Sequence, residues 1–414
     1  MKHILPLILS LLILSSLSAC AVPKADNLMT GITPRQNAVD TVSYTDVSDI
    51  TVTDFALRLF VESMDTEKNT LIAPLSVLTA LSMTANGTDK ETLAQIQDVL
   101  GMPISQLNQW LCEYINALPT AEKYKLSLAN SIWFSDNSHF TVNQDFLQTN
   151  ADYYGADIYR APFDMSTVKE INRWVKEKTD GRIPHVLQSI SADTVMFLIN
   201  ALAFDAEWQN LYESSQIRDG IFTTEDGEAH TAKMMYATEH RYLEDELATG
   251  FIKYYNGQKY AFAALLPNEG ISVREYVQSL DAAHMRALLD NASSATVYTA
   301  IPKFSCEYQA EMDDVLCSMG MTDLFDPAKA NLSLLGNTAT GENLFVSRIL
   351  HKTYINVDER GTKAGAVTVI SVDKTSSMDS EAKSVYLVRP FVYMLIDCEN
   401  KIPLFIGTMM DTEG

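Results

Sequence analysis

Residues 354–380 constrain the fold more than any other part of this sequence. The stretch begins with alternating apolar and polar residues, passes a charged triplet and Gly361, and then runs through a dozen mostly small or β-branched residues. Such a run favours a strand over a helix. It ends in the polar segment KTSSMDS, which has the composition of an exposed loop. A potential strand that leads into an exposed tip is unusual for a plain connection.

The side chains of this stretch alternate in a way that permits it to join a sheet, because neighbouring side chains of a strand point to opposite faces. One set of alternate positions is small or apolar throughout: Thr362, Ala364, Ala366, Thr368, Ile370 and Val372. The other set carries Lys363 and Asp373, and a shift by one residue would bury both charges at a large cost. No proline lies between Gly361 and Met378, so the backbone can complete a ladder of hydrogen bonds.

The composition indicates a globular protein that does not bind nucleic acids. The chain has 414 residues, of which 47% are hydrophobic, and a formal net charge of −22. Such a surface repels phosphate backbones. The cysteines form no CxxC pair, the histidines are scattered, and neither HExxH nor GxSxG occurs. We therefore expect free thiols, no metal site and no cofactor.

The N-terminus has the features of a secretory signal. An apolar run over residues 4–17 follows a basic start, and it is too short and too interrupted by Pro6 to span a membrane comfortably. The run ends in LSAC, which resembles the lipobox of bacterial lipoproteins, where the signal is cleaved before a lipid-carrying cysteine. We therefore predict a signal over residues 1–19 and a lipidated Cys20 that anchors the exported protein at the bacterial cell surface. An ordinary signal peptide followed by a chance cysteine is the alternative.

The rest of the chain divides simply. Residues 20–48 contain few large apolar side chains, and we predict that they form a flexible tether between membrane and domain. No second low-complexity break or internal repeat follows. One domain over residues 49–414 is therefore the simplest division, and we expect it to be a monomer.

Several short motifs occur in an order that resembles the serpins, a family of serine protease inhibitors. Residues 69–76 match the serpin pattern N-x-x-x-S-P-x-S except at Ala73, and the apolar run 195–204 reads as a central strand covered on both faces. Trp208 follows it at the position of a serpin tryptophan. Further matches lie at 129–133 (ANSIW), 234–235 (MM), 261–267 (AFAALLP), 302–304 (PKF), 316–325 (LCSMGMTDLF), 389–397 (RPFVYMLID) and 402–407 (IPLFIG). Each motif is weak alone, but about nine in sequence are specific.

The resemblance implies an α+β serpin fold with a large mixed main sheet, two further sheets, eight or nine helices and an exposed reactive-centre loop over about residues 361–385. It implies that Ser76, Asn200 and His351 form a buried polar cluster under the main sheet, and that Trp208 lies where the loop enters. The three cluster residues could be mistaken for a catalytic triad. We expect them to be buried beyond the reach of a substrate, so the protein is not predicted to be an enzyme.

The implied function is that of a suicide-substrate inhibitor of serine proteases. The target protease attacks the loop, forms an acyl-enzyme, and is trapped when the cut loop inserts as a new strand into the main sheet. The hinge that starts this insertion comprises Glu359, Gly361, Thr362, Ala364, Ala366 and Thr368. A non-inhibitory serpin that acts as a binding or chaperone-like surface protein is the alternative, although such members usually carry proline, charge or bulk in the hinge.

The bond that is cut is predicted from family spacing. Counting from Gly361, the usual position falls at Thr375-Ser376, and a small β-branched residue there suits an elastase-like protease. Cleavage at Lys374-Thr375 would suit a trypsin-like protease with an acidic pocket. The bond after Met378 is a third candidate, and a cysteine protease is an alternative target.

Overall fold

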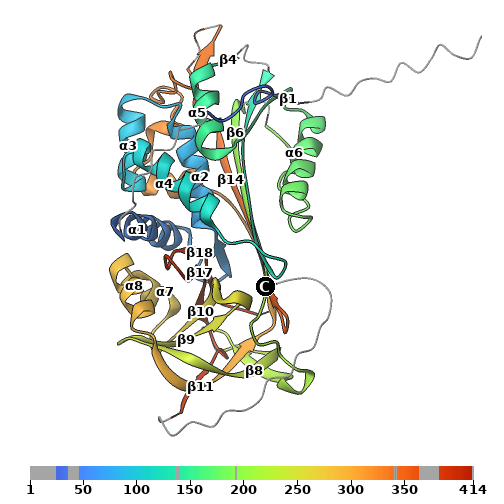
Figure 1. Cartoon of the computed structure of the whole chain (residues 1–414), viewed down its shortest axis with the longest axis vertical. Helices are drawn as coiled ribbons and strands as arrows, with labels where there is room; N and C mark the ends of the chain where they lie inside the picture. The colour runs from blue at the N-terminus through green and yellow to red at the C-terminus, as the bar shows by residue number, and fades with distance from the viewer. Residues whose placement is uncertain are drawn as a thin grey trace, which may run out of the picture.

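The computed structural model describes residues 25–35, 46–136, 140–191, 194–339, 341, 343–362 and 382–412. Over these residues it contains nine α-helices and three sheets of seven, nine and two strands (Figure 1). The predicted α+β class, the number of helices and the three sheets are confirmed. The predicted reactive residues Lys374, Thr375, Ser376 and Met378 lie outside the described residues, as do Cys20, Ala364, Ala366 and Thr368.

The seven-stranded sheet is the main sheet of the prediction. Its strands run in the order β1-β5-β3-β6-β14-β12, with the short β15 paired to β6. Strand β6 is antiparallel to β3 and parallel to β14, so the sheet is mixed. The bounds are β1 Asp26–Asn27, β5 Asp157–Ala161, β3 Tyr124–Ser135, β6 Met196–Glu207, β14 Arg348–Val357, β12 Phe304–Glu311 and β15 Gly361–Thr362.

The nine-stranded sheet fills the lower half of the molecule in Figure 1. Its order is β16-β11-β8-β9-β10-β17-β18-β2, with β7 paired to β8. The bounds are β16 Lys383–Tyr386, β11 Ser293–Pro302, β8 Ala229–Glu244, β9 Ala248–Tyr254, β10 Tyr260–Pro267, β17 Phe391–Asp397, β18 Pro403–Met409, β2 Thr70–Ile72 and β7 Ile217–Thr223. Strands β13 Gly336–Thr338 and β4 Phe140–Val142 form the two-stranded sheet.

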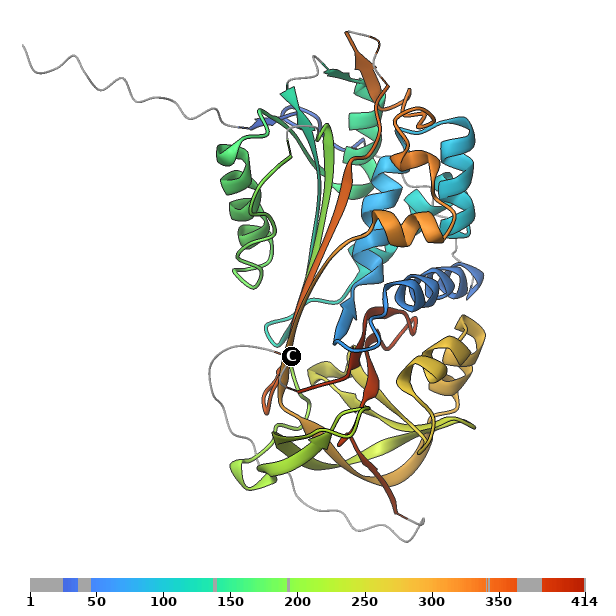
Figure 2. The same ribbon diagram turned by 180° about the vertical axis from the view of Figure 1, so that it is seen from behind.

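The helices cover both faces of the main sheet (Figures 1 and 2). Helices α2 to α5 lie on one face and α6 lies alone on the other. The bounds are α1 Asp46–Ser63, α2 Pro74–Ala85, α3 Lys90–Leu100, α4 Ile104–Ala117, α5 Gln144–Tyr154, α6 Met165–Lys178, α7 Val273–Ser279, α8 Ala282–Asp290 and α9 Asp313–Ser318. Within the described ranges, no helix is both long and apolar enough to cross a membrane.

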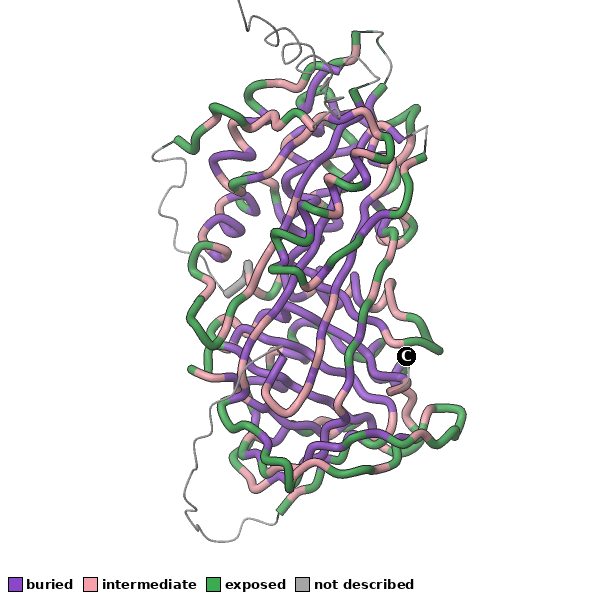
Figure 3. The backbone as a smooth tube through the Cα atoms, turned by 90° about the vertical axis from the view of Figure 1, so that its right-hand side faces the viewer, coloured by how far each residue is buried: buried purple, intermediate pink, exposed green. Residues whose placement is uncertain are grey.

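Strand β6 is buried on both faces, as its apolar sequence indicates. Buried backbone, drawn in purple, runs through the middle of the molecule in Figure 3. Leu198 and Leu202 belong to the large core under α2, whereas Phe197 and Ile199 belong to a second core under α6. Helix α2 begins with Pro74 at its first turn, where a missing amide proton costs nothing, and all of its residues are buried. The sheet therefore lies between two apolar layers.

Part of the segment that we predicted as a free tether is docked on the domain. Strand β1 pairs antiparallel with β5, and Arg160 forms an ion pair of 2.8 Å with Asp26. Arg35 Nε donates to Asp152 Oδ2 at 2.8 Å, while Leu28 packs against the large core. Helix α1 begins at Asp46, three residues before the predicted start of the domain at residue 49.

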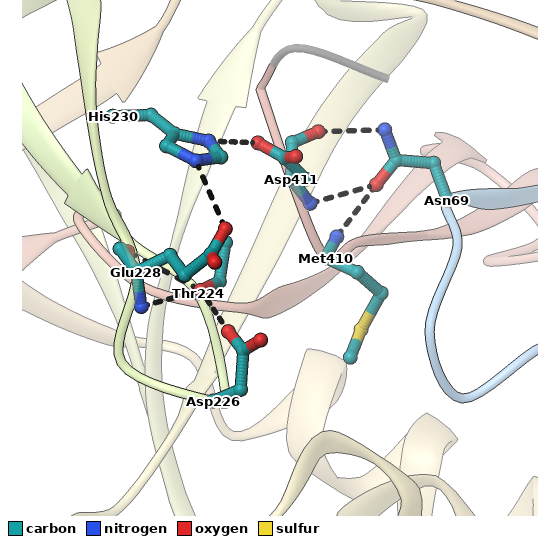
Figure 4. Close-up of polar contacts among 7 residues, drawn as sticks. All are labelled: Asn69, Thr224, Asp226, Glu228, His230, Met410 and Asp411. Atoms are coloured by element: carbon teal, nitrogen blue, oxygen red, sulfur yellow. Dashed lines mark hydrogen bonds and ion pairs between the residues drawn. The ribbon is translucent and has the colours of Figure 1, made fainter.

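The residues that follow the C-terminal strand β18 form hydrogen bonds with the residue before β2 and with β8 (Figure 4). The Asn69 side chain accepts from the backbone N–H of Met410 at 2.6 Å and of Asp411 at 3.0 Å, and its Nδ2 donates to the Asp411 carbonyl at 2.7 Å. His230 Nδ1 lies 2.6 Å from Asp411 Oδ1. Asn69, which opens one of the serpin-like motifs, therefore anchors the end of the predicted C-terminal hairpin β17–β18.

The four cysteines of the described chain, Cys112, Cys306, Cys317 and Cys398, are all free. Across the same residues no group of histidine, cysteine or acidic side chains could hold a metal ion.

Candidate functional site

The main sheet has a seam between its neighbouring strands β6 and β14. Strands β6 and β14 pair directly in parallel through seven register pairs, from Arg348 opposite Phe197 to Tyr354 opposite Ala203. Beyond Ala203 the two strands separate. The chain then turns back after β14, and β15 pairs antiparallel with the end of β6, with Thr362 opposite Ala206. The start of the predicted hinge is therefore already part of the sheet.

Thr362 lies on the core-facing side, which is the side that the alternation of the sequence assigns to it. Its side chain is 2% exposed, and its Oγ1 lies 2.7 Å from the hydroxyl of Tyr255. Burial raises the pKa of Tyr255, so this hydroxyl stays protonated. A small side chain with one hydroxyl group fills this place without an unpaired polar atom.

Gly361 occupies a position that no other residue can fill in this geometry. Its φ of +148° is in the region that favours glycine, and an added Cβ would lie 2.0 Å from the carbonyl oxygen of Ala206 and 2.8 Å from Cα of Glu207. The close approach of the two backbones thus depends on the missing side chain.

Trp208 lies against the hinge segment, which we define as residues 358–362. Its ring stacks on Tyr255 with 4.3 Å between centroids. Its Nε1 donates to the carbonyl of Asp358 at 2.8 Å, and its backbone N–H donates to the carbonyl of Arg360 at 2.9 Å. The tryptophan predicted at the loop entry thus contacts the backbone of the hinge itself.

Glu359 adds a charged contact on the surface side of the hinge. Its carboxylate forms an ion pair with Lys303, and this hydrogen bond lowers the pKa of Glu359. The Tyr212 backbone N–H donates to the Glu359 carbonyl at 3.0 Å. We missed Lys303 and Tyr212 as hinge contacts. In the sequence Lys303 stands out only as part of the PKF motif, and this motif does not indicate that Glu359 is its partner.

Ser76, Asn200 and His351 meet beneath the sheet, and none of them is exposed. His351 Nε2 accepts from the backbone N–H of Ala73 at 3.1 Å, so the ring proton is on Nδ1, which donates to Asn200 Oδ1. Ser76 Oγ lies 3.4 Å from the same Asn200 oxygen. The serine hydroxyl thus faces an amide, which gives no activated nucleophile.

The structure adds two details to this cluster beyond the loss of a hydroxyl that the alanine at position 73 already indicates. The departure from the family pattern at Ala73 removes a hydroxyl, and the Ala73 backbone amide supplies the contact to His351. The Asn200 Nδ2 group is buried and has no hydrogen-bond partner among the described residues. An unpaired buried amide is costly, and it marks the point at which this cluster is incomplete.

A family model described as Serpin (serine protease inhibitor) matches residues 51–412. The chain belongs to the serpin family. A leukocyte elastase inhibitor of Equus caballus is 30% identical over 374 residues, which are 86% of this chain and 97% of that protein. An uncharacterized serpin-like protein of Thermococcus kodakarensis is 27% identical over 87% of this chain and 84% of that protein.

The solved structures agree with the fold at high similarity. The native-state crystal structure of the thermophilic serpin tengpin has a TM-score of 0.89 and 44% identity, covering 94% of this serpin and 100% of that chain. The latent-state structure of tengpin has the same identity and a TM-score of 0.79, covering 90% of this serpin and 100% of that chain. The predicted serpin fold is therefore confirmed, with a closer match to the native state.

We expect the buried histidine to make the stability of this serpin pH-dependent. Burial lowers the pKa of His351 from 6.5 to about 3, so in acid the unfolded chain binds a proton that the folded chain refuses. Stability is then lost as the pH falls from the unfolded pKa toward the folded one. We expect a loss of about 3 kcal/mol between about pH 6.5 and about pH 4 from this residue. Denaturant titrations of the wild type and of His351→Gln should show a shallower acid slope in the variant, and equal slopes would contradict the assignment.

Proposed function

We propose that this serpin is a suicide-substrate inhibitor of serine proteases, with an elastase-like target. The observation that carries the proposal is the pairing of Gly361 and Thr362 with β6 at the mouth of the β6–β14 seam. Gly361 and Thr362, which would be the first two residues of an inserted strand, are small, buried and already paired with β6. The similarity to a leukocyte elastase inhibitor supports the class of target.

The observed register can be continued along β6 to ask whether the rest of the loop suits insertion. If each further residue pairs in the same phase, Ala364 comes opposite Phe204 and Ala366 opposite Leu202, both of which face the large core. Lys363 comes opposite Asp205, on the other face. The small side chains would enter the core, and the one early charge would meet a carboxylate.

The same register brings Thr368 opposite Asn200. A hydroxyl group would then arrive beside the buried Nδ2 that lacks a partner in the described chain. Insertion would thus satisfy a polar group that the present arrangement leaves unpaired. It would also replace the parallel β6–β14 pairing with two antiparallel ladders, which are slightly more stable per residue.

The covalent complex would form through the catalytic serine of the target protease. The protease serine attacks the carbonyl carbon of the reactive bond, the peptide nitrogen leaves with a proton as an amine, and an ester joins loop and protease. Hydrolysis of that ester would release the protease. Insertion of the loop has to move the protease before water reaches the ester, so the speed of insertion decides between inhibitor and substrate.

Mixing the domain with an elastase-like serine protease should give a covalent complex that resists SDS, and a short C-terminal peptide that separates from the complex once SDS unfolds the sheet. Sequencing that peptide identifies the bond, and we expect Ser376 at its N-terminus, or Thr375 with a trypsin-like protease. A protease with a blocked nucleophilic serine is the control and should give neither product. Cleavage without any complex would overturn the inhibitor proposal and favour a non-inhibitory serpin.

The membrane anchor at Cys20 is a second part of the proposal. Ala25, whose backbone N–H donates to Glu170 at 2.7 Å, is five residues from this cysteine, so the lipid would lie within about 18 Å of the docked segment. Anchoring of the exported chain at the bacterial surface requires the thiol. Cys20→Ser should therefore shift the protein from the membrane fraction to the soluble fraction, whereas Cys112→Ser should not.

A further inference from the structure

We infer that Lys253 is a positioning residue for the hinge. Its buried ammonium group fixes Trp208 and Tyr212, which donate hydrogen bonds to the backbone carbonyl groups of the hinge. The structural part of this inference stands alone, and only its consequence for inhibition rests on the proposed function. Lys253 lies in β9, opposite Phe262 of β10, and its side chain is 2% exposed. A lysine this deeply buried needs specific partners.

Two oxygen atoms and two rings surround the Lys253 ammonium group. Its Nζ lies 2.7 Å from Glu239 Oε1 and 3.4 Å from the carbonyl oxygen of Asn210. It also lies 4.4 Å from the ring centroid of Tyr212 and 5.3 Å from that of Trp208. Both distances are within the range of a cation–π interaction, which is strongest where water is excluded.

The same two aromatic residues hold three consecutive carbonyl groups of the hinge. Trp208 donates from its indole to the carbonyl of residue 358 and from its backbone to that of residue 360. Tyr212 donates from its backbone to the carbonyl of residue 359. Trp208 also stacks on Tyr255, which bonds Thr362. All of these contacts therefore involve Trp208 or Tyr212, whose rings lie beside the Lys253 cation, or Tyr255, which stacks on Trp208.

The alternative is that Lys253 only neutralises Glu239. Removal of one partner of a buried ion pair is strongly destabilising, but replacement of both by apolar residues of similar volume is often neutral. The double variant Lys253→Met/Glu239→Leu therefore separates the two roles. It leaves no unpaired charge, yet it gives Trp208 and Tyr212 no cation.

Hydrogen exchange of the backbone amides of Trp208 and Tyr212 measures the hinge directly, because both amides donate to hinge carbonyls. In the double variant we expect these two amides to exchange about tenfold faster, while the melting temperature stays near that of the wild type. The single variant Lys253→Met should show the same faster exchange with lower stability. Wild-type protection in the folded double variant would overturn the inference and leave Lys253 as a counter-charge alone.

Lys178 provides a matched control away from the hinge. It also forms an ion pair, with Asp157 at 2.6 Å, and lies over a tryptophan ring, that of Trp174 at 5.8 Å. Lys178→Met should leave the exchange of the Trp208 and Tyr212 amides unchanged. A similar acceleration in this variant would mean that the effect is global, which would also overturn the inference.

The consequence for inhibition is measured separately. A hinge that is no longer held in the sheet should start insertion more slowly, so the double variant should need severalfold more inhibitor per protease inactivated. If the wild type forms no covalent complex at all, the proposed function fails while the exchange result still decides the role of Lys253. Faster exchange with an unchanged stoichiometry would overturn the link between Lys253 and insertion.

Discussion

Replacing Thr362 with arginine should turn the proposed inhibitor into a substrate. Thr362 is 2% exposed and its hydroxyl lies 2.7 Å from that of Tyr255, so an arginine at this position would carry its charge among buried groups. Burial of an unpaired charge costs several kcal/mol. Since about 1.4 kcal/mol slows a step tenfold, hydrolysis of the acyl-enzyme should overtake insertion, and the stoichiometry of inhibition should rise about tenfold or more.

The measurement is a titration of an elastase-like protease, with gel analysis of complex and cut inhibitor. Thr362→Ser is the matched control, because it keeps the hydroxyl that meets Tyr255 and should remain an inhibitor. The melting temperature of the uncut arginine variant should stay close to that of the wild type, since only two residue pairs join the hinge to β6 and their loss removes little of the sheet. An arginine variant that still traps protease with normal stoichiometry would show that insertion does not begin at this residue.

Cutting the loop should raise the melting temperature of the wild-type protein strongly. Insertion between β6 and β14 would give both strands antiparallel partners in place of one parallel pairing of seven residue pairs. If about ten new hydrogen bonds contribute about 1 kcal/mol each, the gain of about 10 kcal/mol corresponds to a rise of roughly 13 °C for a domain of this size. Scanning calorimetry of the intact and the cut protein measures this directly.

The Thr362→Arg protein, cut at the same bond, is the control for this second result. It has the same broken peptide bond but cannot seat its hinge, so its melting temperature should change little. Equal melting temperatures of the intact and the cut wild type would contradict a sheet that can gain a strand. A rise of the same size in both proteins would mean that the stabilisation has a source other than insertion.

The sequence predicts the strands around this site and the side that each residue faces, because both depend on the alternation of apolar and polar residues. The uninterrupted apolar run of β6 requires burial on both faces, and the alternation after Gly361 assigns Thr362 to the core. The docking of residues 26–27 has no such signal, since a two-residue strand held by backbone pairing and one exposed ion pair shows no periodicity. The Lys253–Glu239 pair is equally hidden. In sequence both are ordinary charges in strands, and only the packing of Trp208 and Tyr212 shows that they are buried.

The docking of β1 on the main sheet has a consequence for a captured protease. Met196 at the far end of β6 is level with Phe134, Phe134 with Arg160, and Arg160 with Asp26. On the proposed register the inserted loop reaches Met196 with Val372, so its cut end would arrive at the same end of the main sheet as the docked N-terminal segment, about four strand spacings away. The captured protease and the membrane anchor would then both lie at the Met196 end of the main sheet. A lipid-anchored serpin would have to lift that end from the bilayer, or peel residues 25–35 from β5, to complete a capture that the free domain completes unhindered.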